Sequence, residues 1–234
     1  MRYSIVIISF LASIPVSGQF RTSLSVGYGT YRMSNLKAFQ KELLADFPED
    51  SRITEDFPGY LYYDLTIAQP LSDQLRMGIS ATYGSTGGRL SYKDYSGEVT
   101  GNQLVRYLGV GVPFKLSVYD NPDKELSLNL VLTPQVSMNW LTLEFYSRLN
   151  NQSDESRYKF RSLNFAIEPG ISATKSFGLW EIDFFGGYNV NVVKGNLFFT
   201  KNEEAYLQDA NGDPVKIDLS GLRFSLGVAY IFDF

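Results

Sequence analysis

The chain has 234 residues and a formal net charge of −4, and it contains neither cysteine nor histidine. Disulfides, thiolate nucleophiles, Cys/His zinc sites and serine hydrolases with a histidine base are therefore excluded, and the acidic balance gives no sign of a nucleic-acid partner. Aromatic residues are frequent (16 Tyr, 17 Phe and 2 Trp), yet no apolar run after the N-terminal segment is long enough for a spanning helix.

The N-terminal residues have the pattern of a secretory signal peptide. Arg2 precedes the apolar run from Ile5 to Ile14, and small or modest residues follow up to Gly18. The pattern predicts a signal peptide over residues 1–18, with cleavage between Gly18 and Gln19, and a mature domain over residues 19–234. The alternative, an N-terminal membrane anchor, needs about twenty apolar residues, which this segment does not supply.

Alternation of apolar and polar residues predicts an all-β chain, because successive side chains of a strand point to opposite faces. The expected strands are 21–33, 60–69, 75–84, 103–118, 125–145, 158–174, 179–194 and 221–234. The connections after the second, fourth and sixth strands are short, whereas 34–57, 85–102, 146–157 and 195–216 are expected to be long loops. This regular pattern is typical of an eight-stranded antiparallel up-and-down transmembrane barrel, with both termini at the short-turn, periplasmic end.

The first long connection, 34–57, is the least generic part of the sequence. We expect a short amphipathic helix in it, with Ser34 or Asn35 as the N-cap and Pro48 as the stop. One interpretation makes this helix a lid over the barrel mouth. The other makes its apolar face a docking surface for a partner protein or for lipopolysaccharide, formed by Leu36, Phe39, Leu43 and Phe47.

Alternation does not say which face of the barrel is buried. A soluble, lipocalin-like barrel would place the Leu/Phe face inside. The polar face is rich in Gly, Ser and Asn, which suit the narrow interior of an eight-stranded barrel, so we expect the apolar face to meet lipid. Aromatic residues near strand ends are candidates for the interfacial girdles: Tyr28, Tyr83, Trp140, Trp180 and Tyr188.

With this orientation, eight charged side chains point into the lumen: Asp64, Arg76, Lys115, Glu168, Glu181, Asp183, Arg223 and Asp233. Buried charges must pair, because an unpaired one costs several kcal/mol. We expect an ion-pair network that plugs the lumen, in which Glu181 and Asp183 share Arg76 or Lys115. A gated ion path through the same residues is the alternative.

The last fourteen residues, GLRFSLGVAYIFDF, have one apolar face and end on an aromatic residue. This ending, the strand pattern and the signal peptide resemble the small outer-membrane β-barrels of Gram-negative bacteria, of the OmpA-transmembrane-like and OmpX-like kind, with the general style of Bacteroidota proteins. The resemblance implies that Tyr230, Phe232 and Phe234 form the C-terminal signal read by the barrel-assembly machinery. It also implies residence in the outer membrane beside lipopolysaccharide.

From this resemblance we expect a non-enzymatic protein without cofactor or metal, because the enzymatic eight-stranded barrels, lipid A palmitoyltransferases and deacylases, use a catalytic histidine with a serine. The expected role is that of a binding, structural or accessory subunit that acts through its extracellular loops, and a larger outer-membrane complex is among its expected partners. The alternative is a small porin-like pore for ions or small solutes, although eight strands leave little room for water.

Overall fold

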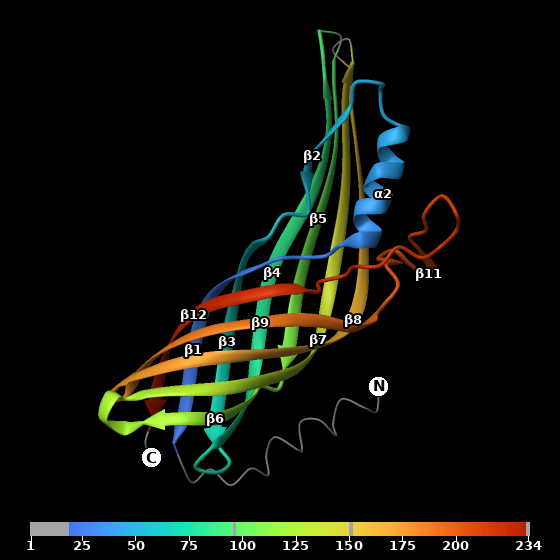
Figure 1. Cartoon of the computed structure of the whole chain (residues 1–234). Helices are drawn as coiled ribbons and strands as arrows, with labels where there is room; N and C mark the ends of the chain where they lie inside the picture. Colours follow the sequence, from blue (N-terminus) through green and yellow to red (C-terminus); the bar gives the residue numbers. More distant parts are fainter. Residues whose placement is uncertain (1–18, 96, 150–151, 233–234) are drawn as a thin grey trace.

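The computed structural model describes residues 19–95, 97–149 and 152–232, so the expected signal peptide, Asp233 and Phe234 lie outside the described residues. Eight antiparallel strand positions close into a ring, which confirms the predicted barrel (Figure 1). Around the ring these are β1 (Phe20–Gly29), β3 (Tyr60–Pro70), β4 (Leu75–Lys93), β5 (Gly97–Gly111) with its continuation β6 (Phe114–Asn121), β7 (Leu126–Leu149), β8 (Gln152–Phe177), β9 (Trp180–Lys194) and β12 (Gly221–Phe232). β12 pairs with β1 and closes the ring.

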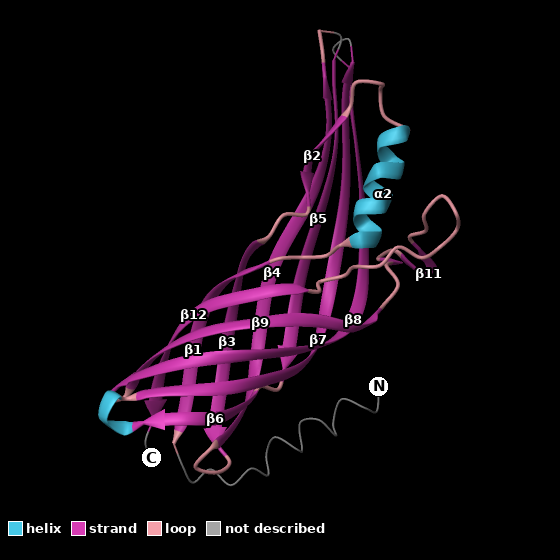
Figure 2. Cartoon of the chain, viewed as in Figure 1, coloured by secondary structure: helices cyan, strands magenta, loops and turns pink. Residues whose placement is uncertain are grey.

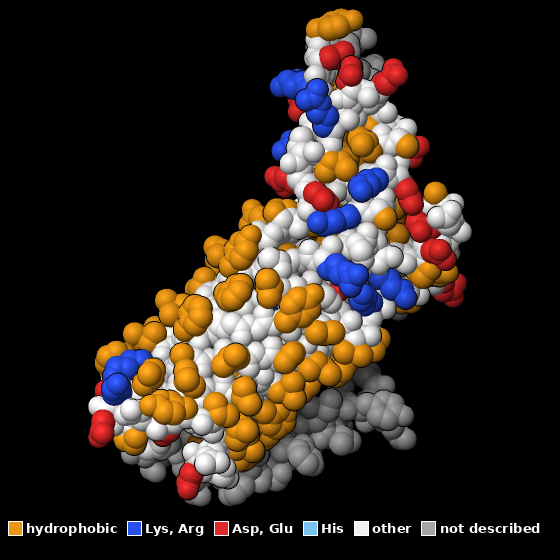
Figure 3. Space-filling view, viewed as in Figure 1, with side chains coloured by type: hydrophobic (Ala, Val, Ile, Leu, Met, Phe, Trp, Pro, Cys, Tyr) orange, Lys and Arg blue, Asp and Glu red, His pale blue; other side chains and the backbone are white. Residues whose placement is uncertain are grey.

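The outer surface of the barrel is apolar and its interior is polar. On β1, Leu24 is 61% exposed, whereas the neighbouring Ser23 is only 6% exposed and faces the lumen. Apolar side chains cover the barrel in the same way in the space-filling view (Figure 3). An apolar surface of this extent marks contact with another apolar phase, so the soluble, lipocalin-like alternative is wrong.

Four strands continue beyond the barrel as an extension that we call the tower: residues 85–93, 97–106, 140–149 and 152–161 (Figure 2). β7 and β8 pair without interruption from Leu126 opposite Lys175 to Leu149 opposite Gln152. The predicted long loops 85–102 and 146–157 are therefore wrong, since both are mostly strand. A strand outside the lipid needs no apolar face, so the polar composition of residues 85–102 and 146–157 resembles that of loops.

The fourth strand position is interrupted at residues 112–113. Pro113 has no N–H to donate to a ladder, and prolines in sheets are found at such breaks. Its carbonyl still accepts a hydrogen bond from the backbone N–H of Gly78, at 3.0 Å. β6 then pairs with both β4 and β7 and completes the ring at the end that carries the turns after β3, β6 and β8, which we call the turn end.

The first insertion forms helix α2 (Ser34–Ala45) and the short strand β2 (Arg52–Asp56), which pairs with β4. The predicted helix is present, but the predicted N-cap, Ser34 or Asn35, is wrong. Met33 occupies that position in the left-handed region (φ 46°) and provides no side-chain cap. The helix ends at Ala45, three residues before Pro48. Among the described residues, no helix is long and apolar enough to cross a membrane.

An apolar core fills the junction between barrel and tower. It is built by the segment that follows β1, by α2, by the inward faces of the tower strands and by the segment that precedes β12. The connection that precedes β12 also carries two short strands, β10 (Phe198–Phe199) and β11 (Asn202–Tyr206). At the opposite end of the barrel, the turn after β6 forms the 3₁₀ helix η1 (Pro122–Lys124). The buried members of this core are Tyr31, Met33, Leu36, Phe39, Phe57, Val105, Tyr107, Leu141, Leu143, Phe160, Leu197, Val215, Ile217 and Leu219.

Candidate functional site: the closed lumen

Near the turn end, a buried carboxylate joins strands from different parts of the ring. Glu181 on β9 is 2% exposed. Its Oε2 accepts a hydrogen bond from Nε of Arg21 on β1 at 2.5 Å, and its Oε1 accepts one from Nη1 of Arg76 on β4 at 3.4 Å. Neither β1 nor β4 is next to β9 in the ring, so these ion pairs span the lumen.

A third ion pair lies in the lumen. Lys115 on β6 donates to Oδ1 of Asp183 at 2.6 Å and to the hydroxyl of Thr174 at 2.8 Å. The Thr174 hydroxyl in turn donates to Asp183. Asp183 is two residues after Glu181 on β9, and strand alternation places both carboxylates on the lumen face. Together the three ion pairs form a charged layer across the barrel.

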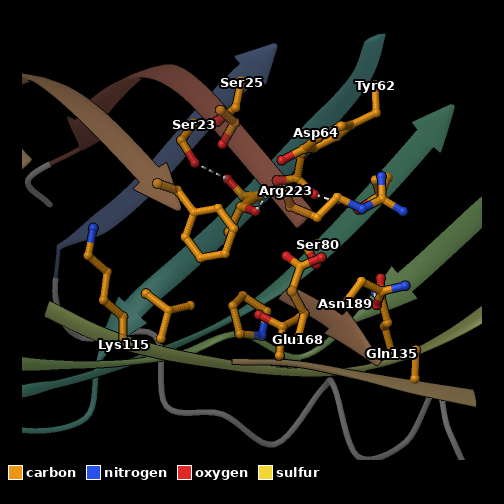
Figure 4. Close-up of a pocket in the computed structure, with 18 of the residues that line it drawn as sticks. Ser23, Ser25, Tyr62, Asp64, Ser80, Lys115, Gln135, Glu168, Asn189 and Arg223 are labelled. Carbon is orange, nitrogen blue, oxygen red and sulfur yellow. Dashed lines mark hydrogen bonds between the residues drawn. The ribbon is translucent and has the colours of Figure 1, made fainter. Parts of the chain in front are cut away.

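Two further predicted lumen carboxylates, Asp64 and Glu168, lie above this layer and form no ion pair among the described residues. Asp64 accepts hydrogen bonds from the hydroxyls of Thr66 and Thr82, each at 2.7 Å. Glu168 on β8 interacts electrostatically with Arg223 and Asp64 across the lumen. Figure 4 shows the three labelled side chains pointing into one interior space.

Arg223 on β12 is bound by tyrosines. Its guanidinium lies 5.0 Å from the ring centroid of Tyr31, 4.9 Å from that of Tyr62 and 5.4 Å from that of Tyr107. It also donates to the Tyr107 hydroxyl at 2.6 Å, and the hydroxyls of Tyr31 and Tyr107 lie 3.2 Å apart. A cation held against aromatic faces in a desolvated site is stabilised without an anionic partner.

Two small cavities lie in the lumen between the described residues. One, of about 120 Å³, lies between the charged layer and the Arg223 cluster; Asp64, Glu168 and Arg223 are among its lining residues. The other, of about 250 Å³, opens toward the turn end beneath Arg76, Lys115 and Glu181. A polar cavity of this size has room for several water molecules, since one water needs only about 10–15 Å³. The charged layer separates the two cavities.

Above the Arg223 cluster, the apolar core closes the mouth. Of the predicted docking face, Leu36 is fully buried and Phe39 is nearly so, while Leu43 is partly buried against the core. Phe47 is half-buried and its ring centroid lies 6.4 Å from that of Phe145. All four side chains therefore pack against the chain itself, as a lid does.

The C-terminal strand places its aromatic residues on the outside at the turn end. Tyr230 packs edge-on against Trp180, with ring centroids 4.9 Å apart, and against Phe232, at 4.8 Å. Phe234 and the predicted lumen residue Asp233 lie outside the described residues.

Among the charged contacts that were not predicted from the sequence, two involve a buried carboxylate. Arg21 lies on the same polar face of β1 as Ser23 and Ser25, so the alternation of this strand indicates that its side chain points into the lumen. The pair of Lys194 and Asp218, at 2.5 Å, joins the end of β9 to the segment before β12, and no local pattern indicates it. Among the described residues, no group of three or more acidic side chains could hold a metal ion.

The fold is similar to those of solved outer-membrane proteins. The crystal structure of the outer membrane protein OprG from Pseudomonas aeruginosa aligns with a TM-score of 0.53 at 11% sequence identity, over 93% of this chain and 97% of that one. The fold is that of an eight-stranded outer-membrane β-barrel.

Other small outer-membrane barrels align less closely. Ail, the attachment invasion locus protein of Yersinia pestis, gives a TM-score of 0.37 at 15% identity, over 92% of this chain and 99% of that one. The outer membrane protease OmpT of Escherichia coli gives 0.43 at 12% identity, over 93% and 97%. These values are too low to carry an argument. No protein-family model matches the chain, and no curated protein does either.

Proposed function

We propose that the chain is an integral, non-enzymatic protein of the bacterial outer membrane that acts as a binding or accessory subunit through its tower. The observation that carries this proposal is the contrast between the two parts of the molecule. The lumen is closed by a charged layer, a tyrosine-bound arginine and an apolar core, whereas the tower presents a large sheet surface beyond the barrel.

Exposed aromatic side chains support a binding role for this end of the molecule. Tyr95, at the end of the β4 hairpin arm, is fully exposed, and Tyr158, Phe198 and Tyr206 are also exposed. Such residues are enriched in the contact surfaces of proteins. In the proposed orientation the tower is extracellular and the turn end is periplasmic. The C-terminal strand, with Tyr230 and Phe232, is then the part that the barrel-assembly machinery recognises.

The absence of histidine and cysteine supports a non-enzymatic role, because a histidine base and a cysteine nucleophile, which many hydrolytic sites use, are missing. The finer assignment to an OmpA- or OmpX-like group of Bacteroidota type belongs to this proposal as well. So do residence beside lipopolysaccharide and membership of a larger outer-membrane complex.

The experiment that tests the proposal is mild detergent extraction of the tagged protein from its native outer membrane, followed by native mass measurement. In a matched variant, residues 90–101 and 145–156 are each replaced by Asn-Gly, which shortens both hairpins and keeps the pairing of Arg89 with Asn102 and of Glu144 with Arg157. We expect a stoichiometric partner that is lost in this variant and retained in Lys41→Ala, an exposed change on α2. A lone barrel in every sample would contradict the proposal.

The second candidate function is a small pore, and the two lumen cavities are the observation that supports it. The ion pairs and the apolar core would have to rearrange before an aqueous path could form. We expect no conductance steps from the protein in planar bilayers. Steps that Glu168→Ala or Arg223→Ala abolish would favour the pore and contradict a plugged barrel.

A further inference from the structure

A row of basic and aromatic side chains crosses the base of the tower on its outer face. Arg106 on β5 lies directly opposite Trp140 on β7, and Trp140 lies directly opposite Arg161 on β8. On the far side of Arg161, Phe198 of β10 continues the row. Directly opposed residues point to the same side of a sheet, and Arg106, Trp140 and Phe198 are exposed, so this side faces outward.

The next outward row toward the barrel is entirely apolar. Leu108, Met138 and Leu163 oppose one another on the same three strands, and they are 45%, 44% and 58% exposed. The row of Arg106, Trp140 and Arg161 is therefore the first polar row above the apolar surface. Figure 3 shows Lys and Arg side chains gathered at this boundary. Tryptophan and arginine are both favoured at the height of lipid headgroups.

This part of the surface carries three basic side chains. Lys159, two residues before Arg161 on β8, is exposed on the same face and adds a third positive charge. The carboxylate of Glu144, higher on β7, is engaged by Arg157 at 2.8 Å. Among the described residues, no ion pair is formed by Arg106 or Lys159, so their charges are available to an external anion.

We propose that Arg106, Arg161 and Lys159, together with Trp140, form a binding site for the phosphate-bearing headgroup of a membrane lipid in the leaflet at the tower side. Adjacent strands are about 4.8 Å apart, so the two arginines start about 10 Å apart and their long side chains can converge on one headgroup. Guanidinium groups bind phosphate with paired hydrogen bonds, and the lipid chains lie against the apolar row below. The inference rests on the membrane residence proposed above, but not on a protein partner.

The two tryptophans provide a direct readout, because Trp140 lies in the site and Trp180 at the turn end. In a Trp180→Phe background, the purified protein in neutral detergent is titrated with a glycolipid that carries phosphate monoesters. We expect a saturable change in Trp140 fluorescence. In Arg106→Gln/Lys159→Gln the apparent affinity falls at least about tenfold, since each cation near an anionic lipid surface contributes on the order of fivefold.

The matched control is Lys175→Gln, which removes a basic residue at the turn end, next to the Phe177 ring, and should bind as the parent does. The heat-dependent mobility of each variant on SDS gels shows that it is folded. Equal affinity for the dephosphorylated glycolipid, or unchanged affinity in the double variant, would overturn the site. An identical response to inorganic phosphate at the same concentration would overturn the lipid as its ligand. The native mass measurement remains a separate test, so failure of the lipid site and failure of the subunit role are distinguishable.

Discussion

Arg21 and Glu181 are 160 positions apart in the sequence, yet the guanidinium of Arg21 donates to the carboxylate of Glu181 at 2.5 Å across the barrel lumen. Both side chains are almost fully buried. A buried charge that loses its partner is strongly destabilising, whereas removal of both charges is much less so. This ion pair therefore links β1 to β9. Comparing the removal of one charge with the removal of both separates the contribution of the charges to stability from that of side-chain packing.

Glu181→Gln should lower the free energy of unfolding by about 3–5 kcal/mol, because it leaves the buried Arg21 without its ion-pair partner. The double variant Arg21→Met/Glu181→Leu should recover most of this loss. Urea unfolding in lipid vesicles, followed by gel mobility, measures both. Glu125→Gln is the control, because the exposed pair that Glu125 forms with Lys175 should contribute at most about 1 kcal/mol. A double variant as unstable as the single one would contradict this account.

The membrane-facing part of the fold could be predicted because lipid outside and a narrow polar lumen inside impose strict alternation on each strand. The lumen positions of Glu181 and Asp183 follow from the same rule. The rule ends at the lipid boundary, so residues 85–102 and 146–157 read as loops although they are paired strands. Their pairing is a tertiary property of two hairpins that stack side by side above the barrel.

The partners of the lumen charges could not be predicted in the same way. Register within a hairpin follows from its turn, but contacts across the ring depend on the stagger of all the strands. Arg223 illustrates this, because its aromatic neighbours come from the segment after β1, from β3 and from β5. The sequence placed it in an ion-pair network, whereas the structure surrounds it with tyrosine rings.

Leu36→Ala should loosen the lid, because Leu36 is fully buried in the core at the barrel mouth. Truncation of a buried leucine costs about 2–5 kcal/mol, and here the loss should appear first as local opening. Hydrogen exchange of residues 34–45 should accelerate while the barrel strands remain protected. Lys41→Ala, on the exposed side of the same helix, should leave exchange unchanged. Equal exchange in Leu36→Ala and the parent would show that the helix is not held by this side chain.

The Asp218 carboxylate should make the segment before β12 sensitive to acid. Burial alone would raise the pKa of Asp218, but hydrogen bonds from Lys194 and Ser220 outweigh it and hold that pKa below its usual range. Because the folded-state pKa is lowered, the contribution is complete above the unfolded pKa of about 4 and is lost as the pH falls through the folded value.

Asp218→Asn should therefore destabilise residues 207–220 by about 1–3 kcal/mol at pH 7, since Lys194 loses its charged acceptor. The difference from the parent should shrink as the pH falls from about 4 through the lowered folded-state pKa of Asp218, where the folded carboxyl itself becomes protonated. Protease accessibility of this segment across a pH series measures the effect. A difference that stays constant down to the acid limit would mean that packing, and not charge, holds the segment.

Gly221 begins β12 where it approaches the segment after β1, and the backbone leaves no room for a side chain. A Cβ at this position would lie 2.0 Å from the carbonyl oxygen of Thr30, which is backbone and cannot rotate away. Gly221→Ala should thus separate the seam between β12 and β1 at the mouth and cost about 1–3 kcal/mol or more.

Gly186→Ala is the matched control for Gly221→Ala. Gly186 lies on β9, beside β12, and a Cβ there would meet only the ring of Phe224, at 3.5 Å, an ordinary contact. Unfolding midpoints in urea and hydrogen exchange at the β1–β12 seam should change in Gly221→Ala and remain near the parent values in Gly186→Ala. Equal midpoints for the two variants would mean that β1 and β12 can separate at this point without loss of stability. The close approach of Thr30 would then not constrain barrel closure.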